Sequence, residues 1–396
     1  MRLPAACSPI LATLSNVFPD WRAAHRQGLA LWVYGVLNAR SACEARVITT
    51  LQMSGSRRET VRQYLREWLR DGADKIAPCA SEVAVPAAFP PLLAWARTLW
   101  HGREALLAID ATQRRQEVTS LVISLLYRSR AAPLCWAVQA ARAAHSYGAA
   151  LEPLIAQVGT AFPRRTIVLT DRGLWSPRLW RALRAAGLHP LMRVTHEIRV
   201  AVGPRQWCPA AALVQHPGQA WVGRAVVHRA AQRRLWATVV VVWEQGQAAP
   251  WVLLTDLPPR VVGVRWYGLR MWIECGFRDC KHFGWDWGHT RRTAPSRVSR
   301  HWLVLAVATL LTLAAGTTVE DAGHSAGVPP AARTGLRPVS VFQLGLAKLQ
   351  ALFRGDGAWP ALALWPEPWP VPPPTLVITY HPTPPSAAWT HAYLPL

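Results

Sequence analysis

Four polar side chains recur at helical spacing within Tyr267–Lys281. Tyr267, Arg270, Glu274 and Lys281 follow one another at intervals of three, four and seven residues. On a continuous α-helix, which advances about 100° per residue, all four project within an arc of about 60°. The surrounding residues are largely apolar or small, so the polar stripe interrupts a segment otherwise suited to a core. A carboxylate beside two cations and a phenol suits a site where metal ions meet phosphate.

Two further carboxylates each end an apolar run that is typical of a buried strand. Asp110 follows Ala105–Ile109, and Asp171 follows Thr166–Thr170. Either aspartate alone is more simply a residue that caps a strand, and the stripe alone also fits a solvated helix face. Together, three hard oxygen ligands can hold two Mg²⁺ ions about 3.5–4 Å apart. We therefore predict Asp110, Asp171 and Glu274 as catalytic metal ligands for phosphodiester chemistry.

The spacing Tyr-x₂-Arg-x₃-Glu-x₆-Lys resembles the YREK signature of DDE-type insertion-sequence transposases, in particular insertion-sequence family four. The resemblance covers about 105–292 and includes Thr112, two residues after the first aspartate. It implies that Asp110 bridges two Mg²⁺ ions, for which Mn²⁺ is a substitute, while Asp171 and Glu274 each complete one metal site.

The same resemblance implies DNA contacts around these carboxylates. Tyr267, Arg270 and Lys281 would contact phosphates beside the scissile bond, and Arg172 would add another contact. Trp251 would stack on a flipped base, as in relatives that close a DNA hairpin during excision. A core position for Trp251 is equally open, because the chain holds 22 tryptophans.

The order of apolar runs favours an α/β fold with a ribonuclease-H-like mixed sheet flanked by helices. In that fold the first and fourth strands are neighbours, which brings Asp110 and Asp171 side by side. A β-rich insertion before the signature helix accounts for most of the distance to Glu274. The expected strands are 105–110, 118–127, 134–138 after a turn at 130–133, 166–171 and 190–194, with helices at 147–158 and from 177 to Gly187.

The N-terminal part reads as helical, with apolar runs at 27–38 and 42–52 and a third helix after a turn at 53–56. Ser56 and Glu59 form a capping-box pattern for that third helix. Arg58, Arg62, Arg66 and Arg70 recur every four residues along it and form a basic stripe on one face. This pattern fits a helix-turn-helix that reads a DNA groove, and equally an ordinary small bundle with solvated arginines partly paired to glutamates.

Charge and composition point to a polyanion as partner. The chain of 396 residues has 44 basic and 22 acidic residues, a formal net charge of +22. Because the basic residues are spread through a globular sequence, DNA fits better than a membrane surface. Seven cysteines without a C-x-x-C pair indicate a reducing cytosol. The uncharged run Trp302–Ala315 is short of the roughly 20 residues of a membrane span and is expected to be a buried helix.

Four regions follow from these patterns. They are an N-terminal helical DNA-binding domain (1–76), a linker and helix (77–104, the linker to about 94 and the helix from Leu92 to Trp100), a catalytic domain (105–316, with the insertion at 195–258), and a C-terminal helix and proline-rich tail (317–396, a loop at 317–338 and the helix at 339–353).

We therefore predict a DNA transposase of the bacterial cytoplasm, associated with the nucleoid. It would cut double-stranded DNA at the terminal inverted repeats of its own mobile element and join them to target DNA. The resemblance implies a homodimer in the DNA complex. Two alternatives remain open: another ribonuclease-H-like nuclease or resolvase, and a catalytically silent DNA-binding protein derived from a transposase.

Overall fold

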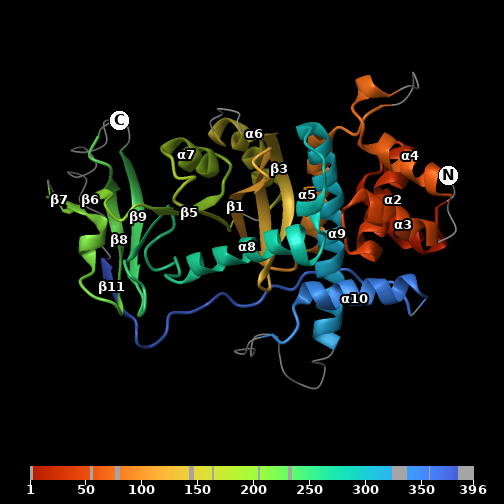
Figure 1. Ribbon diagram of the computed structural model, residues 1–396. Coiled ribbons are helices and arrows are strands. Elements are labelled where there is room, and N and C mark those ends of the chain that lie inside the picture. Colours follow the sequence, from red (N-terminus) through yellow and green to blue (C-terminus); the bar gives the residue numbers. More distant parts are fainter. Residues whose placement is uncertain are drawn as a thin grey trace. The chain divides into compact units, whose positions relative to one another are not determined.

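The computed structural model describes residues 3–53, 57–75, 81–141, 147–162, 165–203, 206–230, 234–322, 337–355 and 357–381. Within these ranges the chain forms two compact units (Figure 1). Unit 1 contains residues from Met1–Arg103, Ala111–Ser146 and Met271–Glu367, and unit 2 contains residues from Glu104–Asp110, Tyr147–Arg270 and Pro368–Leu396. The chain thus leaves unit 2 for unit 1 twice, after Asp110 and after Arg270.

Unit 2 is built on a mixed sheet with the strand order β1-β4-β5-β10-β9-β8-β6-β7. The pairs β1–β4 and β4–β5 are parallel, whereas the remaining neighbours along this path are antiparallel. Helix α6 (Tyr147–Ala161) precedes β4, and helix α7 (Pro177–Ala185) connects β4 to β5. The strands are β1 (Ala105–Arg114), β4 (Thr166–Thr170), β5 (His189–Val194), β6 (Arg199–Gly203), β7 (Gln206–Pro209), β8 (Gln219–Val227), β9 (Leu235–Trp243) and β10 (Trp251–Thr255).

The predicted α/β class and the predicted neighbours β1 and β4 are confirmed. All five residues of β4 are buried, as are Ala105–Ile109 of β1, which explains their uninterrupted apolar character. In unit 1 the end of β1 continues beside a hairpin of β2 (Val118–Tyr127) and β3 (Arg130–Ala140). The strand order β3-β2-β1-β4-β5 is the one expected of a ribonuclease-H-like sheet.

The hairpin turn was predicted at 130–133 but lies at Arg128-Ser129. Both residues have positive φ, 43° and 65°, which suits a two-residue turn that matches the strand twist. The sequence has neither Asn nor Gly there to signal this. Pro133, which suggested a turn, lies inside β3 where the register shifts against Ile123/Ser124, and a proline is tolerated at such a bulge.

Helices dominate the rest of unit 1. The predicted N-terminal helices form as α2 (Ala23–Ala39), α3 (Glu44–Met53) and α4 (Arg58–Leu69), and they follow α1 (Ser8–Val17). Ser56 of the predicted capping box lies outside the described residues. Helix α5 (Val85–Leu99) begins seven residues before the predicted Leu92, because Pro86 occupies its first turn, where a proline is well tolerated.

A long apolar helix, α9 (Pro295–Ala322), forms the centre of unit 1. It is longer than the predicted 302–315, and its end replaces the first part of the loop predicted from Thr317 to Pro338. Among the described helices it alone is long and apolar enough to cross a membrane, but 89% of its most apolar window is buried inside the protein, as in a core helix. Helix α10 (Val341–Phe353) packs against it with backbones in close approach at Gly316 and Gly345.

The signature segment is not the uniform helix that was predicted. It consists of a 3₁₀ turn, η5 (Trp266–Arg270), then α8 (Met271–Arg278), then a π-helical turn, η6 (Asp279–Phe283). A 3₁₀ turn advances about 120° per residue and a π turn less than 100°, so the predicted arc of 60° does not apply. The wide turn is fixed by the amide of Gly284, which donates to the carbonyl oxygen of Asp279 at 2.8 Å.

Helix α8 packs closely on β3 through a glycine. A Cβ atom at Gly276 would lie 2.8 Å from the Cβ atom of Ala131 and 3.0 Å from its carbonyl oxygen. No larger residue fits without displacing α8. This contact therefore fixes how far the helix that carries Glu274 stands from the hairpin.

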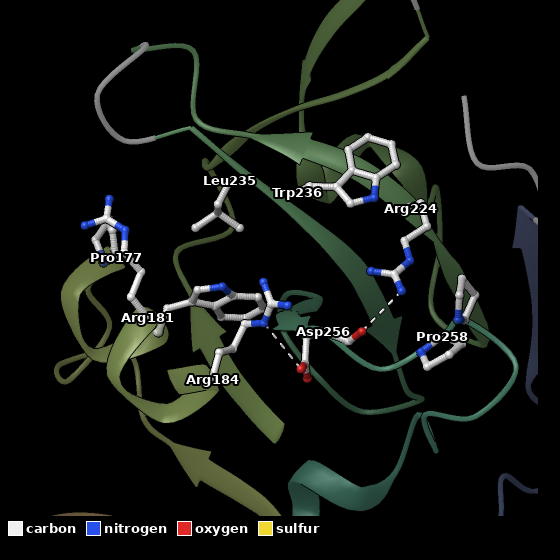
Figure 2. Close-up of a pocket in the computed structure, with 10 residues that line it drawn as sticks. Pro177, Arg181, Arg184, Arg224, Leu235, Trp236, Asp256 and Pro258 are labelled. Atoms are coloured by element: carbon white, nitrogen blue, oxygen red, sulfur yellow. Dashed lines mark hydrogen bonds and ion pairs between the residues drawn. The ribbon is translucent and has the colours of Figure 1, made fainter. Parts of the chain in front are cut away.

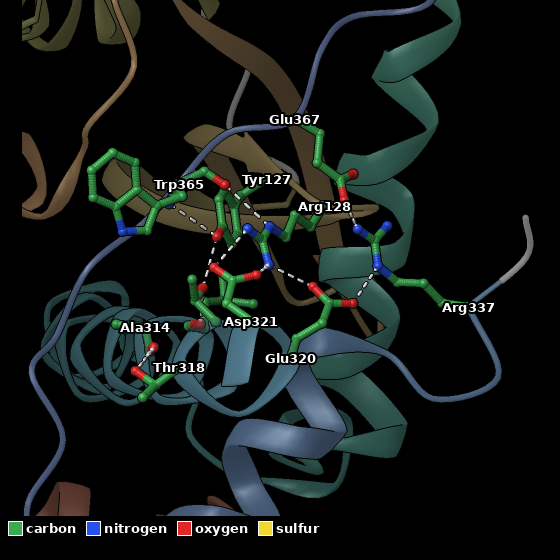
Figure 3. Close-up of polar contacts among 11 residues, drawn as sticks. Tyr127, Arg128, Ala314, Thr318, Glu320, Asp321, Arg337, Trp365 and Glu367 are labelled. Atoms are coloured by element: carbon green, nitrogen blue, oxygen red, sulfur yellow. Dashed lines mark hydrogen bonds and ion pairs between the residues drawn. The ribbon is translucent and has the colours of Figure 1, made fainter. Parts of the chain in front are cut away.

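A buried ion cluster joins the hairpin turn to the end of α9 (Figure 3). The fully buried guanidinium of Arg128 donates to Glu320 Oε2 at 2.6 Å and to Asp321 Oδ1 at 2.8 Å. Its Nε donates to the carbonyl oxygen of Trp365 at 3.1 Å. Arg337 bridges Glu320 and Glu367, so the cluster also holds the C-terminal segment.

The proline-rich segment is extended, as predicted, and it pairs with other parts of the chain at two places. In unit 1, Leu364 is buried and bridges to Trp100. In unit 2, β11 (Val377–His381) pairs in parallel with β8, in the register Val377↔Gln219 to His381↔Gly223. Residues 382–396 lie outside the described part of the chain.

Replacing Gly276 should destabilise the protein. Gly276→Val overpacks the α8–β3 contact and is expected to lower the free energy of unfolding by about 1–3 kcal/mol in denaturant titrations. Gly268→Ala is the matched control, because a Cβ atom there meets nothing within 4 Å. It should change stability by less than about 0.5 kcal/mol. Equal stability of the two variants would contradict the packing argument.

Removing Arg128 should cost more, because Glu320 and Asp321 lose their buried partner. Arg128→Met is expected to lower the free energy of unfolding by about 3–5 kcal/mol, whereas Arg103→Met on the surface should have little effect. Burial raises the pKa of Glu320, but Arg337 and Arg128 outweigh burial and hold it below its ordinary 4.5. The cluster's contribution is thus present at neutral pH and lost as pH falls through that lowered pKa. Unfolding at pH 7 and pH 3 measures both effects.

Candidate active site

Asp110 and Asp171 lie side by side at the carboxyl ends of two parallel strands. The last paired residues of β1 and β4 within this register are Ile109 and Thr170, and each aspartate is the next residue. The backbone amide of Leu174 donates to Asp171 Oδ1 at 3.0 Å, which orients that carboxylate in the turn after β4. The sheet thus brings together two acidic side chains that are 61 positions apart in sequence.

Arg270 pairs with this acidic edge. Its Nη1 donates to Asp110 Oδ2 at 2.6 Å, and both side chains are largely shielded, with exposures of 17% and 14%. Two adjacent carboxylates repel each other, and a guanidinium beside them relieves that repulsion. Arg270 was predicted as a phosphate contact, and the structure places it on the first aspartate.

Tyr267 is buried beside the same groups. Burial raises its pKa to about 12, Arg270 and Arg193 lower it, and the charges of Asp171 and Asp110 raise it. Its phenol is therefore protonated at neutral pH. Its hydroxyl oxygen and Thr170 Oγ1 are buried and find no hydrogen-bond partner among the described residues. Unpaired buried hydroxyls are uncommon, so both are available to a ligand.

Trp251, at the start of β10, belongs to this cluster. Its ring is half-buried and stands edge-on to Tyr267 at 5.4 Å between centroids, while the Arg193 guanidinium lies 5.2 Å from its ring centre. Sequence reasoning missed Arg193, because nothing in the strand His189–Val194 marks it except one charge in an apolar run. The antiparallel pairing of β5 with β10 brings it to Trp251.

The remaining predicted residues are placed separately. Arg172 is exposed in the turn after Asp171. Glu274 and Lys281 belong to unit 1, on α8 and η6. Within the described ranges, no three or more histidine, cysteine, aspartate or glutamate side chains are grouped so as to hold a metal ion. The strand ends thus present two carboxylates together, and the convergence of Glu274 with them stays a prediction.

A basic groove of about 810 Å³ lies in unit 1 along α3, α4 and the segment 289–297. It contains the predicted Arg58, Arg62 and Arg66. Some of the charge is compensated, since Arg62 pairs with Glu59 and Arg66 pairs with Glu44. Sequence reasoning missed that the chain also contributes arginines to the groove from outside the N-terminal helices. These further arginines are Arg291, Arg292 and Arg297, and the groove also contains Arg70, the last arginine of the predicted stripe.

Two buried tyrosines allow a test of the unpaired hydroxyl. Burial raises the pKa of both Tyr127 and Tyr267 to about 12, but the Tyr127 hydroxyl is paired with Thr317 Oγ1 at 2.7 Å. Tyr127→Phe should lower the free energy of unfolding by about 0.5–1.5 kcal/mol, and Tyr267→Phe should leave it unchanged or raise it. Each variant should lose one late-ionising tyrosine in a spectrophotometric titration to pH 12. A clear loss of stability in Tyr267→Phe would contradict this description.

Comparison with known proteins gives a family for the chain. Residues 103–311, more than half of the sequence, match the family described as the transposase DDE domain. No curated protein matches the sequence. Among solved structures, the chain is similar to a piggyBac transposase in a synaptic complex with hairpin DNA, with a TM-score of 0.41, 10% sequence identity, and coverage of 89% of this chain and 80% of that chain. From the family match, this chain belongs to the transposases with a DDE domain.

Proposed function

We propose that this protein is a DNA transposase that cuts the ends of its mobile element, at their terminal inverted repeats, and joins them to target DNA. The observation that carries the proposal is the pair Asp110 and Asp171 at adjoining ends of β1 and β4, flanked by Arg270. Membership of the DDE transposase family supports it. The finer assignment to insertion-sequence family four rests on the Tyr267–Lys281 spacing.

The oxygen ligands of Asp110 and Asp171 suit a divalent metal ion. Aspartate oxygens are the hard ligands that Mg²⁺ and Mn²⁺ prefer, and two unpaired buried hydroxyls lie nearby. In the proposed site Asp110, Asp171 and Glu274 hold two Mg²⁺ ions. When bound, they activate the attacking oxygen and stabilise the leaving oxygen of the phosphodiester.

The residues around the carboxylates have roles in binding the DNA strand. We assign Arg270 to a phosphate beside the scissile bond, so it exchanges its carboxylate partner Asp110 for DNA. Tyr267, protonated at neutral pH, can donate its unpaired hydroxyl to a phosphate oxygen. Lys281 and Arg172 add contacts, and the half-buried ring of Trp251 offers a face for a flipped base.

Duplex DNA is the proposed partner of the basic groove. Seven arginines line it, and five of them pair with acidic side chains, so the surface keeps an excess of positive charge that is smaller than the arginine count suggests. Such a surface follows the phosphate backbone without reading sequence. We propose that the predicted N-terminal domain (1–76) binds element ends through it, with 105–316 as the catalytic region and a homodimer pairing two ends.

The Arg270–Asp110 ion pair also agrees with a catalytically silent, DNA-binding relative, since it occupies one of the two carboxylates. Carboxylate variants separate the two functions. Asp110→Asn, Asp171→Asn and Glu274→Gln should each lower metal-dependent nicking of DNA that carries the element ends by at least about 10³-fold, while DNA affinity changes little. Glu197→Gln, at an exposed position in unit 2, is the control. Equal nicking by the wild type and Glu274→Gln would end the catalytic assignment.

Product analysis in the same reactions separates a transposase from a nuclease or resolvase. A transposase should join cut 3′ ends to a labelled target duplex in the presence of Mg²⁺. Release of cut ends without any joined product, across Mg²⁺ and Mn²⁺, would favour the ribonuclease-H-like nuclease instead.

A further inference from the structure

A second basic pocket lies within unit 2, on residues that the proposed active site does not use (Figure 2). It has a volume of about 850 Å³. Helix α7 contributes Trp180, Arg181 and Arg184, strand β8 contributes Arg224, and β9 contributes Trp236. The segment after β10 closes it with Asp256 and two prolines.

The charges of this pocket are unbalanced. Three arginines line the pocket, and its one carboxylate, Asp256, already has His189 Nδ1 at 3.1 Å and Arg184 Nε at 3.5 Å. Arg224 does not use that carboxylate, since its Nη2 donates to the backbone carbonyl oxygen of Asp256 at 3.2 Å. Figure 2 shows Arg184 and Arg224 on two sides of Asp256. An anionic ligand would supply the missing negative charge.

The electrostatics of Arg224 agree with this imbalance. Burial lowers its pKa, Asp256 raises it, and the neighbouring charge of Arg184 lowers it. The side chain is therefore a guanidinium that has lost part of its hydration and stands near a second one. Anion binding relieves both costs.

The uncharged walls of the pocket indicate what kind of anion fits. Trp236 is half-buried with part of its ring accessible, and Leu235, Pro177, Pro258 and Pro259 add apolar surface. Inorganic phosphate needs no such surface. A nucleotide unit within a DNA strand combines a phosphate with a flat base and a sugar, which suits arginines beside an indole.

We propose that this pocket is a second DNA-binding site, which holds the phosphate of one nucleotide between Arg181, Arg184 and Arg224 with its base or sugar against Trp236. The choice of DNA as the ligand rests on the proposed function. The site adds a contact outside the carboxylates and outside the basic groove of unit 1. An acidic protein segment is the competing ligand, because it lacks the base.

Single arginine variants of the full chain test the site. Arg181→Ala should weaken binding of a fluorescent DNA duplex about 10-fold in anisotropy titrations and reduce the slope of log K against log salt by about 1. Arg178→Ala is the matched control. It removes an exposed arginine from the same helix that lies outside this pocket and pairs with Glu152 at 2.5 Å. It should change affinity by less than about 3-fold.

The base contact has its own test. Trp236→Leu should weaken binding of a single-stranded oligonucleotide several-fold without changing the salt slope, because stacking releases no counterions. Inorganic phosphate at about 10 mM should compete poorly with DNA in the wild type. A polyglutamate peptide that displaces DNA as well as an unlabelled oligonucleotide does, with no effect of Trp236→Leu, would overturn the assignment to DNA.

The result is separable from the catalytic proposal. If Arg181→Ala and Arg178→Ala bind DNA with equal affinity and equal salt slope, the pocket assignment fails, whatever the carboxylate variants show. If Arg181→Ala alone loses affinity while the wild type neither nicks nor joins DNA, the pocket stands and the catalytic assignment fails. Circular dichroism of both variants confirms folding, since both side chains are exposed on α7.

Discussion

The parallel pairing of β1 with β4 is the constraint on which the candidate active site depends. The paired register ends at Ile109 and Thr170, and an aspartate follows each of them, although β1 itself continues to Arg114. A cation beside such carboxylates stabilises their charged form. In this structure Arg270 provides it, at the end of the 3₁₀ turn that leads out of unit 2. Tyr267 and the Trp251–Arg193 stack are the groups packed beside that pairing.

The path of the chain places Asp110 and Arg270 at the ends of two segments of unit 2. Unit 2 ends at Asp110 on one crossing and at Arg270 on another, so two candidate residues sit where the chain leaves for unit 1. Glu274 follows within one helical turn of the second crossing. The Gly276 contact seats α8, the helix that carries Glu274, on the hairpin.

Much of this arrangement follows from local sequence patterns. Apolar runs that end in Asp110 and Asp171 predicted buried strands, and the order of elements predicted that these strands are neighbours, which the register confirms. The Arg58–Arg66 repeat predicted the arginine-rich face that lines the groove. These features depend on residues close in sequence or on a known order of strands.

Other features depend on contacts that the sequence does not announce. The signature segment changes from 3₁₀ to α to π geometry, and the π turn is closed by the hydrogen bond from the Gly284 amide to the Asp279 carbonyl oxygen. The Arg128 turn forms without a turn residue, since its guanidinium is neutralised by acidic residues 192 and 193 positions away. The second basic pocket, in unit 2, likewise brings together arginines from α7 and β8, which are distant in sequence. The sequence gives no sign that these arginines lie near each other.

The parallel pairing of β11 with β8 has a consequence for synthesis on the ribosome. Strand β8 ends at Val227 and its partner begins at Val377, so 150 positions of chain must be translated before this side of β8 is covered. During that interval the nascent sheet presents open amide and carbonyl groups along Gln219–Gly223, a template for pairing with other extended chains. A chain that ends before Val377 would therefore keep an open sheet edge along β8 and should tend to aggregate.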